Sequence, residues 1–542
     1  MVDRHQIVLG GNKEGQQILF DAGMANRHGL ITGATGTGKT VTLQLLAESF
    51  SRLGVPVFSA DVKSDLSGIA SPGQEHQKIT ERINRIGLQE HSFEGCPILF
   101  WDLFGQTGHP IRTTVSEMGP ILLANLLNLN ETQSGILHVA FTVADAQGLL
   151  LLDLKDLHTM LGWMVDHRQE LAKEYGNFST TSITTIQRNL LVLKESGGIN
   201  FFGEPALKIG DLMRTDFSGR GVVSLLDAST LYSSPKIYTS FLLWLLSELM
   251  EELPERGDAP LPKLIFFFDE AHLLFDNAPP ALLQRITQVV RLIRSKGVGI
   301  FFVSQYPNDI PDEVLGQLGC RIQHALRAFT PKDQKAVRVA AETFRQNPQI
   351  DTEAMITELG TGEALISTLD DQGRPTMVDW CLLSPPRSHI GPLENTERER
   401  LFLNSPLKGL YDTPIDRQSA YEILTERAIA LQPPPMPEPQ DQSSITQQVI
   451  NAGKSVFGGG QRQSVGEALL KSVVRTVGSQ IGRSLIRGIL GSLLVGDNNK
   501  IRSFRWPEHV LSVRIKGSCF FLSNRSSFTI TYFINSLPRA LP

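Results

Sequence analysis

Residues 31–40 read Ile-Thr-Gly-Ala-Thr-Gly-Thr-Gly-Lys-Thr and contain the pattern G-x-x-x-x-G-K-[ST]. The apolar pair Leu30-Ile31 ends a predicted strand before this loop, and Val41 to Leu53 is a predicted helix after it. A phosphate-binding loop requires this strand–loop–helix context, because its backbone N–H groups and the helix N-terminus face the phosphates. A glycine-rich turn that binds nothing would not need these flanks. The stretch therefore predicts that the chain binds a nucleoside triphosphate.

Two residues of this loop have predicted chemical roles. Lys39 is expected to reach the β- and γ-phosphates, and the Thr40 hydroxyl is expected to ligate Mg²⁺. The residues expected to bind the nucleotide are Gly33, Ala34, Thr35, Gly36, Thr37, Gly38, Lys39, Thr40 and Val41.

Composition and length indicate a globular protein with more than one domain. The chain has 542 residues, of which 41% are hydrophobic and 20% are charged, so two or three domains are expected. The formal net charge is −5, which does not indicate nucleic-acid binding. From Ile445 onward, however, 13 Lys and Arg face three Asp and Glu, a balance of +10 that leaves −15 for the rest. This asymmetry suggests that the tail meets an anionic partner.

Several classes of protein are excluded by what the sequence lacks. The four cysteines are scattered without a C-x-x-C pair, which argues against a zinc site or a disulfide framework. The N-terminus has no apolar signal-peptide core, and the most apolar runs, such as Phe241–Leu249, are too short to span a bilayer. We therefore expect a cytoplasmic protein without a transmembrane segment.

The alternation of short apolar runs with helical patterns predicts an α/β fold. The expected core is a mostly parallel sheet with helices on both faces, and Leu264–Phe268 is an unbroken apolar run typical of a central strand. Residues 115–215 are mainly helical and interrupt the strand pattern. The predicted strands are Val55–Val62, Pro97–Leu103, Val222–Leu226, Leu264–Phe268, Val298–Val303, Arg321–Ala328, Ala364–Leu369 and Thr376–Leu383.

The second motif with chemical content follows the central strand. Leu264–Phe268 is followed by Asp269 and Glu270, which is the Walker B pattern. Asp269 is expected to hold the Mg²⁺ shell, and Glu270 is expected to orient and activate the attacking water. An acidic pair at a strand end is common by chance, but it becomes specific after a phosphate loop in an α/β pattern.

Weaker signals complete the predicted catalytic set. Gln305 ends the next strand and is a candidate sensor of the γ-phosphate and the lytic water. Arg294 and Arg321 are candidates for an arginine finger that acts in a neighbouring subunit, with a solvated helix face or an internal ion pair as the alternative. His272 completes the letters Asp-Glu-Ala-His; we interpret this as a coincidence with the helicase box, because no Q-R-x-G-R-x-G-R motif occurs.

These motifs resemble those of the HerA/FtsK superfamily of hexameric P-loop ATPases. The resemblance covers Ile7 to Leu383 and, more narrowly, is to the bacterial HerA-like DUF853 (YjgR-like) group. It implies a RecA-like core that binds ATP and Mg²⁺ and assembles as a homo-oligomer, expected to be a hexamer. The residues that carry it are Arg27–Ile31, Gly33–Thr40, Asp61, Phe268–His272, Arg294–Gly297, Ser304-Gln305 and Cys320–Ile322.

The predicted organisation has seven segments. Pro-rich residues near 431–444 cannot form regular structure, and Gln463–Leu494 is a basic, amphipathic helical pattern. The segments are a first part of the ATPase core with a short β segment (1–114), a helical insertion (115–215), the second part of the core (216–385), a helical extension (386–430), a linker (431–444), a basic tail (445–498) and an atypical, poorly ordered extension (499–542).

Three functions remain open from the sequence. The favoured one is a ring-forming ATPase that translocates on DNA, as a helicase or pump. The alternatives are an ATP-driven ring that remodels protein, and a nucleotide-dependent switch that docks a protein partner on the C-terminal tail. Stimulation of ATP turnover by duplex DNA would distinguish the first from the other two.

Overall fold

The computed structural model describes residues 5–229, 235–257, 259–276 and 280–430, together with 514–515 and 518–519. The chain divides into two units, residues 1–487 and 488–542. In the second unit the described residues form two short strands, β13 (Arg514–Ile515) and β14 (Ser518–Cys519), which pair antiparallel. The predicted linker, the basic tail and the rest of the 499–542 extension lie outside the described residues.

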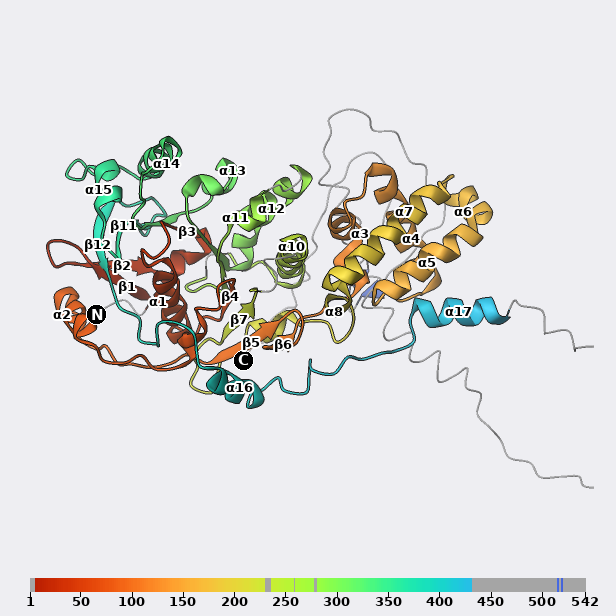
Figure 1. The fold of residues 1–542 in the computed structure, drawn as a ribbon, viewed down its shortest axis with the longest axis horizontal. Coiled ribbons are helices and arrows are strands. Elements are labelled where there is room, and N and C mark those ends of the chain that lie inside the picture. Colours follow the sequence, from red (N-terminus) through yellow and green to blue (C-terminus); the bar gives the residue numbers. More distant parts are fainter. Residues whose placement is uncertain are drawn as a thin grey trace, which may run out of the picture. The chain divides into compact units, whose positions relative to one another are not determined.

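One mixed sheet organises the first unit (Figure 1). Within the described ranges, twelve strands pair in the order β2-β1-β12-β11-β10-β3-β9-β8-β4-β7-β5-β6. Their bounds are β1 (Gln6–Gly11), β2 (Gln17–Asp21), β3 (Gly29–Thr32), β4 (Val57–Asp61), β5 (Ile98–Asp102), β6 (His109–Pro110), β7 (Val223–Asp227), β8 (Leu264–Phe268), β9 (Val298–Ser304), β10 (Cys320–Gln323), β11 (Glu363–Ser367) and β12 (Asp379–Leu383).

The parallel part of this sheet contains the strands of both predicted motifs. Every neighbouring pair from β10 through β3, β9, β8, β4, β7 and β5 to β6 is parallel. The remaining strands, β11, β12, β1 and β2, extend one edge by antiparallel pairing. The expected mostly parallel α/β core is confirmed.

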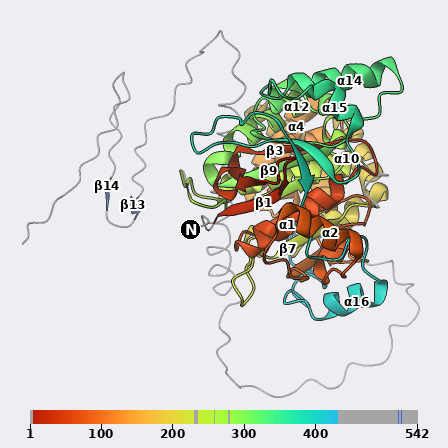
Figure 2. The same cartoon turned by 90° about the vertical axis from the view of Figure 1, so that its left-hand side faces the viewer.

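Helices cover both faces of the sheet, as Figure 2 shows for α1 (Lys39–Arg52) and α12 (Pro280–Ile293). In β8, Ile265 and Phe267 belong to the buried cluster that contains α1, while Phe266 and Phe268 belong to the cluster of α10 (Pro235–Glu252) and α12. Successive side chains of a strand point to opposite faces. This is why the unbroken apolar run Leu264–Phe268 forms a central strand.

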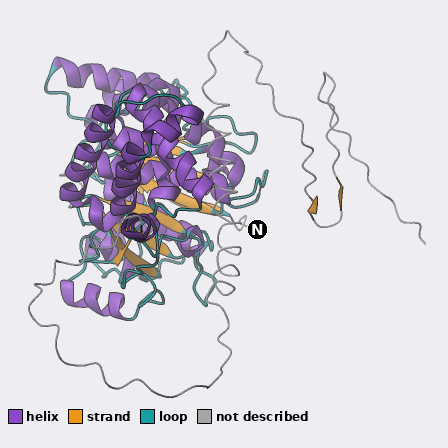
Figure 3. Cartoon of the chain, turned by 90° about the vertical axis from the view of Figure 1, so that its right-hand side faces the viewer, coloured by secondary structure: helices purple, strands orange, loops and turns teal. Residues whose placement is uncertain are grey.

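Helices fill the sequence between β6 and β7, as predicted for 115–215, although the domain boundaries themselves stay a prediction. They are labelled in Figure 1, and Figure 3, which turns the right-hand side of that view toward the reader, shows helices in front of the strands. Asn130 and Asp153 start two of these helices with reciprocal capping hydrogen bonds, the local signal that sets where each begins. The helices are α3 (Val115–Leu126), α4 (Glu131–Gln147), α5 (Leu154–Asp166), α6 (Arg168–Tyr175), α7 (Thr180–Leu193), α8 (Ile199–Phe201) and α9 (Ile209–Leu212).

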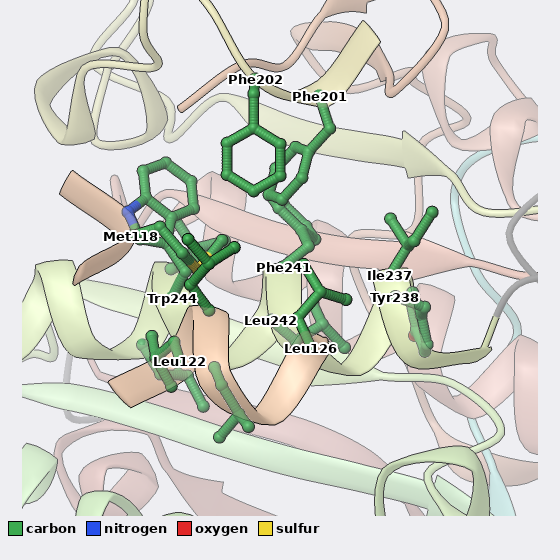
Figure 4. Packing of buried hydrophobic residues seen from close by; sticks show 14 of the residues in the cluster. Met118, Leu122, Leu126, Phe201, Phe202, Ile237, Tyr238, Phe241, Leu242 and Trp244 are labelled. Carbon is green, nitrogen blue, oxygen red and sulfur yellow. The ribbon is translucent and has the colours of Figure 1, made fainter. Parts of the chain in front are cut away.

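The helical region and the sheet share one apolar core. Figure 4 shows Phe241 and Trp244 of α10 beside Phe201, with Met118 and Leu122 of α3 in the same cluster. The ring centroids of Phe201 and Phe241 lie 6.0 Å apart in an edge-on arrangement. Because α10 also packs on β8, the helical region is anchored to the sheet through this helix.

After β12 the chain crosses the outer side of α1 and forms the predicted helical extension. Buried Glu48 of α1 accepts hydrogen bonds from the backbone N–H groups of Arg387 and Ser388. The chain then forms α16 (Asn395–Leu403) and α17 (Ala420–Ala430). Lys155 of α5 pairs with Glu422 of α17 at 3.2 Å, so the extension contacts the helical region.

One predicted strand is much shorter than expected. The sequence indicated a strand over Arg321–Ala328, but β10 ends at Gln323. Beyond it, the His324 N–H donates to the Thr32 carbonyl at 2.7 Å, and the Ala325 carbonyl accepts from the Ala34 N–H at 2.8 Å. These residues leave the ladder because they support the loop that follows β3.

Candidate functional site

The predicted site residues lie at one edge of the sheet. The carboxyl ends of parallel strands meet at the same edge, where α/β proteins bind their ligands. The loops after β3, β4, β8, β9 and β10 therefore come together there. They contain the phosphate loop, residues 62–65, Asp269-Glu270, Gln305 and His324.

The phosphate loop is held by the strands beside it. The Gly33 N–H donates to the Gln305 carbonyl at 3.2 Å, and the Ala34 N–H donates to the Ala325 carbonyl at 2.8 Å. Gly36 and Gly38 have φ of 78° and 116°, which other residues rarely adopt. A Cβ on Gly33 would lie 2.5 Å from the Cβ of His324. The loop therefore requires glycine for its backbone path and for its packing.

His324 lies under this loop, and the sequence analysis did not identify it. Its Nε2 is 2.9 Å from the Thr42 hydroxyl of α1. Burial and the nearby charge of Lys39 lower the pKa of His324 to about 4. The imidazole is therefore neutral at physiological pH and adds no charge beside Lys39. A single histidine after a strand gave no signal for this supporting role.

Lys39 lies inside the loop. Its ammonium donates to the carbonyl oxygens of Gly33 at 2.7 Å and Ala34 at 3.2 Å, and the residue is 7% exposed. Burial and the neighbouring charge of Lys63 lower the pKa of Lys39. The position suits the predicted contact with phosphate oxygens, which would replace these carbonyl contacts.

Thr40 begins α1 next to a carboxylate that the sequence analysis did not single out. Its hydroxyl donates to Oδ2 of Asp65 at 3.4 Å. Oδ1 of Asp65 and Oδ1 of Asp61 are buried and have no hydrogen-bond partner among the described residues. Such oxygen atoms suit Mg²⁺ and its bound waters. Asp65 escaped notice because it lies in a short polar loop that matches no general motif.

The described residues do not form a complete metal cage. Among them, no three His, Cys, Asp or Glu side chains converge to hold an ion. Mg²⁺ commonly keeps several waters and binds through one or two protein oxygens together with substrate phosphates. Thr40 and Asp269 stay the predicted protein ligands of a magnesium ion whose shell a nucleotide would complete.

The two Walker B carboxylates follow β8 and are both buried. Burial and the adjacent Glu270 raise the pKa of Asp269 to about 7. Glu270 adopts a φ of 47° and is 5% exposed. Its Oε1 is 2.5 Å from the ammonium of Lys63, and its Oε2 is 3.3 Å from Nδ1 of His272. Lys63 belongs to neither sequence motif, so its contact with Glu270 could be identified only from the structure.

Three further strands on this side also end in aspartate. Asp61 of β4, Asp227 of β7 and Asp102 of β5 are in register across the sheet. Burial raises the pKa of Asp61 to about 6, with added repulsion from Asp65 and Asp227. Oδ2 of Asp227 accepts from the Arg398 guanidinium of α16 at 2.9 Å. The C-terminal extension therefore reaches the same edge of the sheet as the phosphate loop.

The sensor candidate lies close to the phosphate loop. Gln305 is joined to Gly33 through its carbonyl oxygen, while the preceding Ser304 hydroxyl donates to Asp309 at 2.5 Å. Gln305 is half-buried beside the loop. Its proposed contact with a γ-phosphate stays a prediction.

The two candidate arginines lie away from the phosphate loop of their own chain. Arg294 precedes β9 and its charge acts on His28 at the amino end of β3, whereas the loop follows the carboxyl end of β3. Arg321 lies within β10 and donates to the Leu315 carbonyl at 3.1 Å. Any contact with phosphate would have to be made in another subunit, and this role stays a prediction.

Within the described ranges, no helix combines the length and the apolar character needed to cross a membrane.

Comparison with curated proteins finds two relatives of archaeal origin. The chain is 31% identical over 120 residues to the DNA double-strand break repair helicase HerA of Pyrococcus furiosus, covering 22% of this chain and 21% of the relative. It is 23% identical over 357 residues to the probable helicase MJ1565 of Methanocaldococcus jannaschii, covering 65% and 62%. The matches thus span about a fifth and about three-fifths of these relatives.

Comparison with solved structures finds VirB4 and TrwB proteins among its matches. VirB4 of Thermoanaerobacter pseudethanolicus matches with 16% identity and a TM-score of 0.47, covering 71% of this chain and 97% of that one. The bacterial conjugative coupling protein TrwB matches with 13% identity and a TM-score of 0.48, covering 72% and 91%.

A comparison with family models extends over nearly the whole chain. The matching family is described as "Helicase HerA-like C-terminal", and the match runs over residues 6–500. It includes the phosphate loop, the Walker B pair and the strands that position them. The resemblance to HerA-like ATPases drawn from the motifs is confirmed: the chain belongs to the Helicase HerA-like C-terminal family.

Proposed function

We propose that this chain is an ATPase that hydrolyses ATP in the presence of Mg²⁺. The observation that carries the proposal is the convergence of Lys39, Thr40 and the Asp269-Glu270 pair at one edge of the sheet. The loop backbone and Lys39 bind the phosphates, while Thr40 and Asp269 hold the metal. Bound Mg²⁺ supplies positive charge that offsets the charge developing on the phosphate oxygens.

Hydrolysis then needs a group that takes a proton from water. Glu270 follows the strand next to β9 and lies within the same edge as Lys39, so it is the proposed general base. Gln305, at the end of the neighbouring strand, is proposed to orient the water and the γ-phosphate. Because Glu270 is buried, few water molecules other than the attacking one can reach its carboxylate.

We further propose that the ATPase works as a homo-oligomeric ring, a hexamer, that moves on DNA. Membership of a family named for a helicase supports a nucleic-acid substrate, and the name of one curated relative, a DNA double-strand break repair helicase, supports DNA. The positions of Arg294 and Arg321 within their own chain are compatible with a ring in which one of them acts in a neighbour's site.

The test measures ATP turnover on protein fractionated by size, with and without duplex DNA. The proposal expects turnover only in the assembled fraction, a severalfold increase with DNA, and none in the Lys39→Ala variant. Assembled protein whose turnover ignores DNA would instead favour a protein-remodelling ring. A monomer with full turnover would overturn the ring.

A further inference from the structure

The loop after β4 brings a second lysine to the phosphate site. Lys63 follows Asp61 by two residues, and its ammonium lies 2.5 Å from Oε1 of Glu270. Its side chain is 40% exposed, whereas that of Glu270 is 7% exposed. The lysine stem therefore lies at the rim, and only its charged end reaches into the site.

Lys63 also borders the space that Lys39 serves. The charge of Lys63 acts on Lys39, and the charges of Asp269 and Glu270 act on both lysines. The charged ends of both lysines therefore lie near the Walker B carboxylates and near each other, in one region of the phosphate site. Two neighbouring ammonium groups attract a group with more than one negative charge, and the terminal phosphate of a nucleoside triphosphate is such a group.

We propose that Lys63 is a further catalytic residue, which binds the γ-phosphate during turnover and is held by Glu270 in the arrangement described here. The proposal rests on the ATPase function proposed above. The ammonium changes partner from the Glu270 carboxylate to a γ-phosphate oxygen, a short movement for a flexible lysine side chain. The exchange leaves the carboxylate oxygen available to accept a proton from water.

The step is balanced in atoms and charge. The water oxygen forms a bond to the γ-phosphorus, and the bond from that phosphorus to the β,γ-bridging oxygen breaks with its electron pair left on ADP. Glu270 accepts the proton that the water loses. Lys63 and Lys39 stabilise the charge on the phosphate oxygens without giving up a proton.

A purely structural ion pair is the competing explanation, because a buried carboxylate needs a counter-charge. The two explanations differ in which nucleotide binds less tightly when Lys63 is replaced. A γ-phosphate contact affects ATP and leaves ADP unaffected, whereas a lost ion pair changes the site for both nucleotides alike. The Glu270→Gln background removes the ion pair and stalls hydrolysis, so equilibrium binding of both nucleotides can be measured there.

The experiment compares ATP and ADP binding, with Mg²⁺, to full-length Glu270→Gln protein with and without Lys63→Met. We expect ATP affinity to fall about 10-fold to 100-fold, the effect of one charge-assisted hydrogen bond, and ADP affinity to change less than about threefold. Lys63→Arg should keep most of the ATP affinity. Exposed Lys173 of α6 offers the matched control Lys173→Met, which changes the charge equally and should leave both affinities unchanged.

The ADP measurement also reports whether each variant is folded. If Lys63→Met lost ADP binding, Lys63→Gln would replace it, because an uncharged polar side chain suits the half-exposed stem. Equal effects on ATP and ADP, or no effect on either, would overturn the assignment and leave Lys63 as the partner of Glu270. A Glu270→Gln protein that bound neither nucleotide would overturn the proposed ATPase function itself.

Discussion

The guanidinium of Arg398 in α16 donates from Nη2 to Oδ2 of Asp227 at 2.9 Å, at the carboxyl end of β7. The guanidinium also lies over the ring of Phe100, 4.9 Å from its centroid. The other carboxylate oxygen of Asp227 accepts from the Ser64 hydroxyl at 3.4 Å, in the loop that carries Lys63. The C-terminal extension is thus attached to the sheet beside the loop that contacts Glu270.

Replacing Arg398 by alanine should release α16 from this edge. The change removes a charge-assisted hydrogen bond and a ring contact, and we expect a local loss of about 2–3 kcal/mol. Hydrogen exchange and limited proteolysis across residues 386–403 measure the effect. Arg400→Ala on the exposed face of the same helix is the control, and equal protection in both variants would contradict the prediction.

Glu270→Gln should bind ATP with Mg²⁺ but turn it over at least about 100-fold more slowly. The amide has nearly the same shape as the carboxylate, but it cannot take up the proton and it loses the negative charge that pairs with Lys63. Nucleotide binding and single-turnover hydrolysis measure the two effects separately. Near wild-type turnover would show that Glu270 is not the base.

Asp65→Asn should raise the Mg²⁺ concentration needed for half-maximal turnover about tenfold. A Thr40 hydroxyl that donates its proton to Asp65 turns its lone pairs toward the metal, and groups that orient a ligand typically change metal affinity by ~10-fold to 100-fold. Titration of turnover with free Mg²⁺ measures this. As a control, Asp371→Asn at an exposed position should leave the Mg²⁺ titration unchanged. An unchanged titration for Asp65→Asn would show that its contact with Thr40 does not affect Mg²⁺ binding.

The sequence predicted most of the sheet's strands and both motifs, because these follow from local rules. The apolar run of β8 and the glycines of the phosphate loop each carry their own signal. Long-range placement had no such signal. The positions of Lys63 and Asp65 depend on the pairing of β4 beside β8, which crosses some 200 residues of chain.

His324 illustrates a second limit of sequence reasoning. The sequence around it favoured a continuing strand, but the chain turns under the phosphate loop and packs against Gly33. The reason is tertiary, because the N–H of Ala34 needs the carbonyl of Ala325. Arg294 and Arg321 show the opposite case. The sequence identified them as candidate arginine fingers, but the structure of one chain does not test a role in a neighbouring subunit.

Arg321→Ala or Arg294→Ala should bind ATP but turn it over ~10³–10⁵-fold more slowly if the arginine is a finger in a neighbouring site. Mixing such a variant with Lys39→Ala protein should restore part of the activity, because some hybrid interfaces contain one intact site. Turnover of mixed, co-assembled rings measures this rescue. Absence of rescue would indicate an arginine that serves its own chain's structure.

The contribution of His28 to the stability of the core should fall on mild acidification. Its Nδ1 accepts from the Ile300 N–H at 3.0 Å and its Nε2 lies 2.8 Å from the Val290 carbonyl, so the neutral imidazole satisfies both contacts. Burial lowers the pKa of His28 to about 4.

The unfolded chain takes up the His28 proton near pH 6.5. The stability that the neutral imidazole contributes is therefore complete above pH 6.5 and is lost as the pH falls to 4. The loss attributable to His28 is on the order of 3 kcal/mol over that window. Chemical denaturation at pH 7.5, 5.5 and 4.5 measures it, with His28→Asn for comparison because the asparagine amide does not titrate over this range. The variant should be less stable at pH 7.5 but lose less on acidification, and an unchanged pH dependence would show that His28 does not contribute to it.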